Sequence, residues 1–160
     1  MTIQVGDTLP AATLARMTED GPDKVETQDY FAGRRIALFS VPGAFTPTCS
    51  ARHLPGFIDK ADALKAKGVD EIVGMAVNDV FVMAAWGKSA GADGKVTLLS
   101  DGNAAFVKAL GLDFDGSAFG MGTRGRRFAM VVNDNVVEKL YVEAPGEFRV
   151  SAADHVLAEL

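Results

Sequence analysis

The sequence predicts an α/β fold with a mixed central sheet flanked by helices, and three observations support this prediction. Short, continuous apolar runs alternate with patterns of helical period along the 160-residue chain. Such runs are typical of strands that are covered on both faces, as in parallel sheets. The last two runs are separated by Asn133-Asp134-Asn135, a composition typical of a hairpin turn. The sheet is therefore expected to combine parallel and antiparallel strands in a three-layer domain.

The apolar runs define five predicted strands. They cover residues 35–41, 71–77, 95–99, 127–132 and 136–142. Helical patterns follow the first three strands, which is the order expected for parallel neighbours. The arrangement resembles a thioredoxin-like fold that carries extra N-terminal strands. No internal repeat, low-complexity tract or linker interrupts the chain, so residues 1–160 are expected to form a single domain.

Helix-start and helix-stop residues predict four helices between and after these strands. The helices, each with the residues that delimit it, are 54–64 (stop at Gly68), 80–90 (N-cap pair Asn78-Asp79), 103–110 (stop at Gly111) and a C-terminal helix (cap over 151–154). The apolar residues of the first helix recur at three- and four-residue spacing, which gives it one buried face.

The composition is typical of a soluble globular protein, with 48% hydrophobic residues, 23% charged residues and a net charge of −5. An acidic surface repels nucleic-acid phosphates and anionic lipids, so neither nucleic acid nor a membrane is expected as a partner. The single cysteine excludes intramolecular disulfides, and two histidines make a zinc site improbable. With no basic segment followed by an apolar run at the start, a cytoplasmic protein is expected.

The most informative segment surrounds the single cysteine, Cys49, between a predicted buried strand and a helix. Thr46 is a candidate N-cap, and Pro47 then takes the first helical position, where its missing N–H costs nothing. Thr48 and Cys49 fall in the first turn, whose N–H groups and positive dipole end favour a thiolate. The alternative is that Cys49 is a small buried hydrophobe, as many free cysteines are. Its position at the carboxyl end of a strand favours a reactive site.

Here the sequence resembles the peroxiredoxin family. Pro42, Thr46 and Cys49 match the family's proline, threonine and peroxidatic cysteine at their spacing, within the run VPGAFTPTCSARHLPGF. The run resembles the short dimeric branch typified by mammalian peroxiredoxin five. Similarity continues around Trp86-Gly87 and over 95–101 and 127–132, so it covers nearly the whole chain.

The resemblance implies a role for each catalytic residue. Cys49 is expected to attack the hydroperoxide, and the Thr46 hydroxyl to lie against the peroxide oxygens. Pro42 is expected to shield the sulfur from bulk water. The family's site arginine corresponds to Arg127, whose guanidinium favours a thiolate and hydrogen-bonds peroxide. The N–H groups of Thr48 and Cys49 are expected to complete the cradle around the peroxide.

Further residues are expected to contact substrate, and several alternatives stay open. The expected substrate contacts beyond the catalytic residues are Thr48, Gly43, Phe45 and His53. For His53, a hydrogen bond near the pocket or the subunit interface is the other expected role. Arg124 and Arg126 compete with Arg127 for the site position, although strand alternation predicts opposite faces for Arg126 and Arg127. Arg127 could instead pair with surface carboxylates. A Cys49/His53 metal pair has too few ligands to form a site.

Members of this branch that have a resolving cysteine carry it near the equivalent of Val150, and this chain does not. The sequence therefore predicts a one-cysteine thiol peroxidase, recycled by an external thiol such as glutathione with glutaredoxin, or thioredoxin. No metal, haem, flavin or other cofactor is expected. A glutaredoxin-like thiol protein is a rival, but neither a CxxC motif nor a recognisable glutathione groove is present. A non-catalytic interaction or chaperone module with a redox-reporting cysteine is the rival from another class.

The resemblance also implies a homodimer built from loops near the cysteine. The apolar residues expected to contribute are Phe45, Leu54, Pro55, Phe81 and Trp86. Aromatic side chains of this kind are enriched at the centres of interfaces. The alternative is that these residues fill the core of one chain.

Overall fold

The computed structural model describes the backbone of residues 1–160 and every side chain except that of Cys49. Its main sheet has seven strands: β1 (Thr13–Thr18), β2 (Gly21–Glu26), β3 (Arg35–Ser40), β4 (Glu71–Ala76), β5 (Thr97–Ser100), β8 (Phe128–Asn133) and β9 (Val136–Val142). Their spatial order is β2-β1-β5-β4-β3-β8-β9. The central strands β3, β4 and β5 are parallel, and the outer pairs are antiparallel. The predicted mixed sheet with extra N-terminal strands is confirmed.

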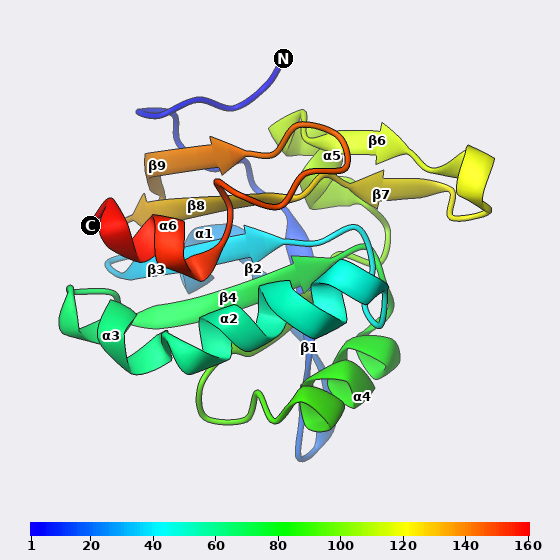
Figure 1. Cartoon of the computed structure of the whole chain (residues 1–160), viewed down its shortest axis with the longest axis horizontal. Helices are drawn as coiled ribbons and strands as arrows, with labels where there is room; N and C mark the ends of the chain where they lie inside the picture. The colour runs from blue at the N-terminus through cyan, green and yellow to red at the C-terminus, as the bar shows by residue number, and fades with distance from the viewer.

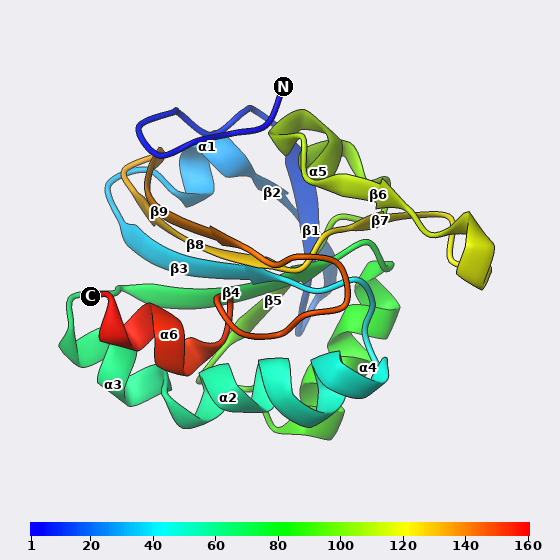
Figure 2. The ribbon, with the colours of Figure 1, turned by 45° about the horizontal axis from the view of Figure 1, so that its top comes forward.

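Helices cover both faces of this sheet, as Figures 1 and 2 show. One face carries α2 (Leu54–Asp59), α3 (Ala61–Ala66), α4 (Val80–Ala90) and α6 (Ala153–Ala158). The other face carries α1 (Thr27–Tyr30) and α5 (Ala105–Leu110) together with the N-terminal segment. A small second sheet of β6 (Asp113–Asp115) and β7 (Thr123–Gly125), with the 3-10 turn η2 (Ser117–Phe119), projects from one end.

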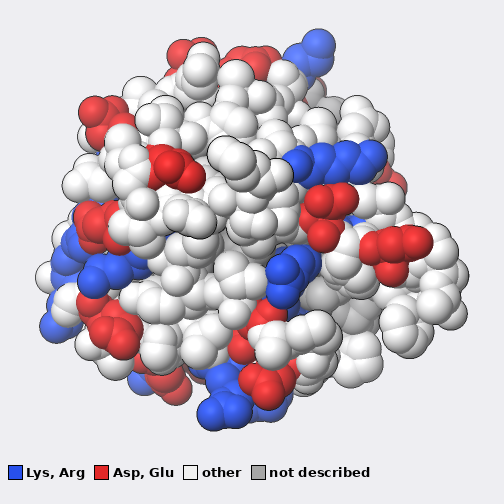
Figure 3. Space-filling model, turned by 90° about the horizontal axis from the view of Figure 1, so that it is seen from above, with Lys and Arg blue, Asp and Glu red and all other residues white. Residues whose placement is uncertain are grey.

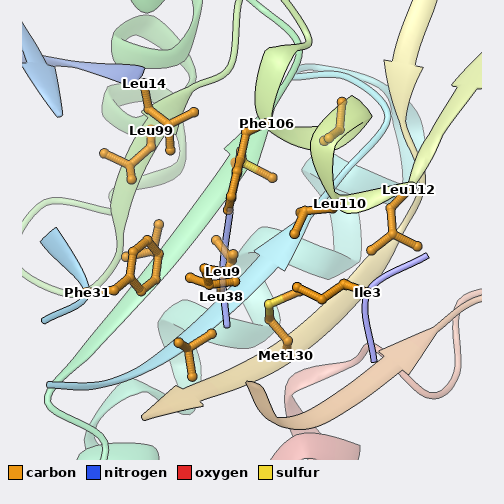
Figure 4. Packing of buried hydrophobic residues seen from close by; sticks show 14 of the residues in the cluster. Ile3, Leu9, Leu14, Phe31, Leu38, Leu99, Phe106, Leu110, Leu112 and Met130 are labelled. Atoms are coloured by element: carbon orange, nitrogen blue, oxygen red, sulfur yellow. The ribbon is translucent and has the colours of Figure 1, made fainter. Parts of the chain in front are cut away.

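Two apolar cores lie on opposite faces of the sheet because side chains alternate along each strand. In β3, Ile36 and Leu38 face the core under α5, whereas Ala37 and Phe39 face the core under α2, α3, α4 and α6. Figure 4 shows the first core, in which Leu38 and Phe106 pack with residues of the N-terminal segment. Because both faces are covered, these strands read as continuous apolar runs in the sequence.

Local sequence signals fix several element ends. Asp79 caps α4 by accepting a hydrogen bond from the N–H of Val82 at 2.8 Å, and Gly91 ends the helix in the left-handed conformation. The β8–β9 turn has positive φ at Asp134 and Asn135, as a two-residue hairpin loop of type I′ requires. The predicted turn and the 80–90 helix are confirmed.

The predicted strands and helices differ from the structure at several of their ends. β5 starts at Thr97 rather than at residue 95, and the predicted 54–64 helix is two helices, α2 and α3, which are separated at Lys60. α5 starts at Ala105 rather than at residue 103, because the Asp101 carboxylate accepts the N–H groups of Phe106 and Val107. The cap therefore comes from a buried side chain at the end of β5.

Charged side chains of both signs are interspersed on the face shown in Figure 3. This distribution agrees with the small net charge of −5. Among the residues that the structure describes, no helix is long and apolar enough to cross a membrane.

Candidate active site

The predicted reactive segment lies where β3 ends. The carbonyl of Thr46 accepts the N–H of Ser50 at 2.9 Å, and residues 47–59 are helical without a break. Pro47 is therefore the first helical residue, as predicted. The first part of this helix is a π-turn, η1 (Cys49–His53), a rare geometry that occurs often at functional sites. The side chain of Cys49, predicted as the nucleophile, lies outside the described part of the structure.

The Thr46 hydroxyl has a defined orientation at this helix start. It donates a hydrogen bond to the Gly43 carbonyl at 2.7 Å. Because the hydroxyl proton is used in this bond, the oxygen presents its lone pairs to a donor such as a peroxide O–H. The Thr46 side chain can therefore accept a hydrogen bond and orient its donor.

The loop between β3 and the helix is held from two sides. Asn78 accepts the N–H of Ala44 at 2.9 Å, and Arg124 donates to the carbonyls of Val77 and Met121. A Cβ atom added at Gly43 would lie 3.2 Å from Thr46 Cγ2 and 3.3 Å from Arg124 Nη1. This close approach explains why a residue without a side chain stands there.

A pocket of about 410 Å³ opens beside this loop. Its lining is Pro42, Thr48, Phe114, Phe119, Met121, Arg126, Arg127, Glu143, Ala144, Pro145, Gly146, Glu147 and Phe148. One wall contains Pro42 and Thr48 from the loop over residues 42–48. Another contains residues 144–148 of the segment 144–150 between β9 and α6, which we call the strap (Figure 1). Most of the lining is apolar, with two guanidinium groups and few other polar groups, as is common for small-molecule sites.

Arg127 is oriented by a buried histidine. Its Nη1 lies 2.8 Å from Nδ1 of His53, and Nε2 of His53 lies 3.0 Å from the carbonyl oxygen of Ser151. A guanidinium only donates hydrogen bonds, so Nδ1 must be the acceptor and Nε2 must carry the proton. The two contacts therefore define one neutral tautomer of His53.

The surroundings of His53 keep it neutral. Its side chain is 0% exposed and packs between the rings of Phe39, Phe57 and Phe148. Burial, and next the positive charge of Arg127, lower the pKa of His53 to about 3. His53 is thus a fixed hydrogen-bond acceptor for Arg127 at physiological pH.

A second buried polar group, the Glu143 carboxylate, stands directly before the strap in the sequence. Oε2 of Glu143 accepts the N–H groups of Arg149 and Ser151 and the Ser151 hydroxyl, at 2.6, 2.8 and 2.6 Å. Burial alone would raise the pKa of Glu143, but these hydrogen bonds outweigh it and the pKa lies below its usual range. The strap residue Phe148 lies over Arg52 and Arg127, with its ring centroid 4.7 and 5.7 Å from their guanidinium carbons.

Comparison with known proteins identifies the family of this chain. The redoxin family matches residues 4–157. Peroxiredoxin-2B of Arabidopsis thaliana is 47% identical over 161 residues, which cover 99% of this chain and 98% of that protein. The chain is a peroxiredoxin.

Solved structures agree with this assignment. Reduced Prx3 of Vibrio vulnificus, in complex with H₂O₂, is 51% identical with a TM-score of 0.96, and the match covers 99% of both chains. The antioxidant protein of Plasmodium falciparum, a 1-Cys peroxiredoxin, is 30% identical with a TM-score of 0.90, over 96% of both chains. The predicted family, the thioredoxin-like fold and the assignment as a thiol peroxidase are therefore confirmed.

Some of the predicted site residues of this peroxiredoxin lie together at the pocket, and others lie outside it. Pro42, Thr48 and Arg127 line the pocket, and Thr46 is bonded to the same loop. Gly43 and Phe45 are not part of the pocket wall; Phe45 is 53% exposed and has a positive φ of 63°. These two residues shape the loop in this structure.

Three expectations need correction. His53 is fully buried and reaches the pocket only through Arg127, so it does not contact substrate directly in this structure. Arg126 and Arg127 do not lie on opposite faces: both line the pocket, because they precede β8, where strand alternation does not apply. Arg124, the other competitor for the site position, bonds to the carbonyls of Val77 and Met121 and lies beside Gly43 of the loop.

Trp86 belongs to the core rather than to the pocket mouth. It is 1% exposed, and its Nε1 donates to the Ser50 hydroxyl at 3.0 Å, which ties the π-turn to α4. Sequence reasoning missed Glu143, Phe148 and Ser151. They stand in a C-terminal segment with no motif, and the only available signal was a carboxylate directly after a predicted strand.

Proposed function

We propose that this peroxiredoxin reduces hydrogen peroxide and organic hydroperoxides through a sulfenic acid on Cys49, which an external thiol then recycles. The observation that carries the proposal is the placement of Arg127. Its guanidinium lines the pocket with Thr48 of the first helical turn, and His53 holds one of its nitrogens. A guanidinium in such a place favours a thiolate and donates hydrogen bonds to peroxide oxygens.

In the proposed first step, the Cys49 thiolate attacks the distal oxygen of the peroxide. The S–O bond forms as the O–O bond breaks, and the leaving oxygen takes up a proton to become water or an alcohol. The sulfur loses two electrons and the peroxide gains them. The Thr46 oxygen accepts a hydrogen bond from the peroxide O–H and so orients it for attack.

The pocket supports organic hydroperoxides as a substrate class. Aromatic and aliphatic side chains from the β6–β7 hairpin and the strap surround most of it, including Phe114, Met121 and Phe148. An apolar group attached to the peroxide loses contact with water there.

Recycling is proposed to use two external thiol groups. The first attacks the sulfenic sulfur, forms a mixed disulfide and releases water; the second reduces the disulfide and restores Cys49. Glutathione with glutaredoxin is the preferred candidate, and thioredoxin is the second. Because turnover needs such thiols, we propose a reducing compartment, the cytoplasm, as the site of action.

A homodimer is also proposed, with a smaller set of contact residues than the sequence suggests. Phe45 and Phe81 are 53% and 64% exposed, as a contact with a second copy of the chain requires. Leu54 and Trp86 are buried in the core of the chain, so they are removed from the expected interface. In sedimentation, Phe81→Asp should move the protein from dimer to monomer at micromolar concentration, while Val136→Ala should not. A wild-type protein that sediments as a monomer would contradict the proposal.

Steady-state peroxide consumption tests the proposed function. Wild type and Cys49→Ser are compared with hydrogen peroxide and with cumene hydroperoxide, each with dithiothreitol, glutathione plus glutaredoxin, or thioredoxin plus its reductase. The wild type is expected to consume both peroxides with dithiothreitol and with the glutathione system, and Cys49→Ser neither. Equal rates for the two proteins would contradict the role of Cys49. Turnover with thioredoxin alone would contradict the preferred reductant.

A further inference from the structure

Glu143 is a buried carboxylate that the proposed chemistry does not use. It is 4% exposed, and none of the ion pairs between described side chains includes it. Burying a charge without a counter-ion costs free energy unless hydrogen bonds compensate. Three side-chain hydrogen bonds of Glu143 converge on one oxygen, from Arg149 N–H and from the N–H and hydroxyl of Ser151.

These hydrogen bonds are the first in a continuous series of contacts that runs from Glu143 to Arg127 in the pocket. Glu143 holds Ser151 by its N–H and hydroxyl, and the carbonyl of the same residue accepts Nε2–H of His53. His53 then offers Nδ1 to Arg127 at 2.8 Å. The backbone N–H of Glu143 also donates to the carbonyl of Arg127 at 3.0 Å. Glu143 therefore holds the main chain of Arg127 and, through two residues, its guanidinium.

We propose that Glu143 is a positioning residue of the peroxide site, acting on the Arg127 guanidinium through Ser151 and His53. The inference rests on the proposed function, in which Arg127 acts on the thiolate and the peroxide. If the strap backbone moves, the Ser151 carbonyl no longer fixes the His53 ring, and Nδ1 no longer holds the guanidinium. Displacement of a catalytic group by about 1 Å lowers rates by up to about a hundredfold.

The tautomer of His53 gives a readout that does not depend on activity. The chain has only two histidines, His53 and His155, so the ring nitrogens can be assigned by NMR of ¹⁵N-histidine-labelled protein. In the wild type, His53 is expected to carry its proton on Nε2 at pH 7. In Glu143→Ala, the His53 signals are expected to average between the two tautomers or to broaden. A wild-type His53 protonated on Nδ1, or an unchanged pattern in Glu143→Ala, would overturn the proposal.

Rates of peroxide reduction test the consequence. Glu143→Ala removes all three acceptor contacts and should lower the second-order rate constant by about ten- to a hundredfold. Glu143→Gln keeps an oxygen that can accept the same bonds and should recover most of the rate. Glu138→Gln removes a carboxylate of β9 that pairs with Arg35 instead, and it should behave as wild type. Thermal unfolding of each variant verifies that it is folded.

A double-mutant cycle separates positioning from a general structural loss. If Glu143 acts through Arg127, then Glu143→Ala should slow the Arg127→Met variant by less than twofold. Independent losses that multiply would overturn the proposal. A strongly slowed Arg127→Met beside an unchanged Glu143→Ala would overturn it while leaving the proposed function intact. An Arg127→Met variant with the wild-type rate would instead overturn the role of Arg127 in the proposed function, and this inference with it.

Discussion

The two walls of the pocket are held in different ways. The loop over residues 42–48 is fixed by local bonds and by two neighbours: Thr46 bonds to Gly43, Asn78 to Ala44, and Arg124 packs against the loop. The strap over residues 144–150 is fixed at its end by one carboxylate oxygen of Glu143. The first wall carries Thr46, the proposed acceptor for the peroxide O–H, and the strap carries Phe148, whose ring lies beside the Arg127 guanidinium.

This difference predicts how strongly substitutions in each wall affect peroxide reduction. Changing Thr46 in the first wall removes the proposed hydrogen bond to the reacting peroxide group. A change in the strap removes apolar contacts to the organic part of the substrate or shifts Arg127. The expected losses should therefore be larger for the first wall, and those for the strap should depend on the size of the substrate.

Thr46 in the first wall should show the largest effect. Thr46→Val keeps the shape of the side chain but removes the oxygen that accepts from the peroxide, so peroxide reduction should slow by about a hundredfold or more. Thr46→Ser keeps the oxygen and should stay within about fivefold of wild type. Stopped-flow rates with hydrogen peroxide measure both. A Thr46→Val rate close to wild type would mean that this wall does not hold the peroxide.

His53, which contacts Arg127 and the strap residue Phe148, should make stability depend on pH. The unfolded histidine gains a proton below about pH 6.5, whereas burial and Arg127 hold the folded pKa at about 3. Its contribution to stability is thus complete above about pH 6.5 and is lost as the pH falls toward 3. The free energy of unfolding should decrease by up to about 1.4 kcal/mol per pH unit in this window.

Urea unfolding between pH 6.5 and 5 measures this slope. His53→Gln should flatten the slope, while His155→Gln, which changes a half-buried histidine of α6, should keep it. Equal slopes in wild type and His53→Gln would show that His53 is not held neutral.

Phe148 in the strap should show the smallest effect, and one that depends on the substrate. Phe148→Ala removes apolar pocket surface and a ring beside His53, so the KM for cumene hydroperoxide should rise by about three- to tenfold. The rate with hydrogen peroxide should change less, because that substrate has no apolar group. Val136→Ala, outside the pocket, is the control. Equal changes for both substrates would contradict a strap that contacts the organic group.

The first wall could be predicted from the sequence because its signals are local. Pro47 at the helix start and the spacing from Pro42 to Cys49 stand within ten residues of one another. The strands of the sheet could also be predicted, because strands that are buried on both faces appear in the sequence as continuous apolar runs. The N-cap at Asp79 and the turn at Asp134-Asn135 are also local signals, and the structure agrees with both.

The contacts that orient Arg127 could not be predicted, because they join residues far apart in the sequence. Ser151 meets His53 across 98 positions, and Arg127 meets His53 across 74. No spacing rule connects such residues before the sheet is assembled. For the same reason, the prediction that Arg126 and Arg127 lie on opposite faces was wrong. Their positions depend on where β8 starts rather than on strand alternation.

A single-turnover reaction without added thiol tests the central claim most directly. Reduced wild-type protein is mixed with excess hydrogen peroxide and dimedone, and peroxide loss and protein mass are followed. The wild type is expected to consume one peroxide per chain at first and to carry one dimedone adduct on Cys49. Prolonged exposure without the trap should give sulfinic and sulfonic forms of Cys49. A Cys49→Ser protein that consumes as much peroxide, or a wild type with no adduct on Cys49, would contradict the account.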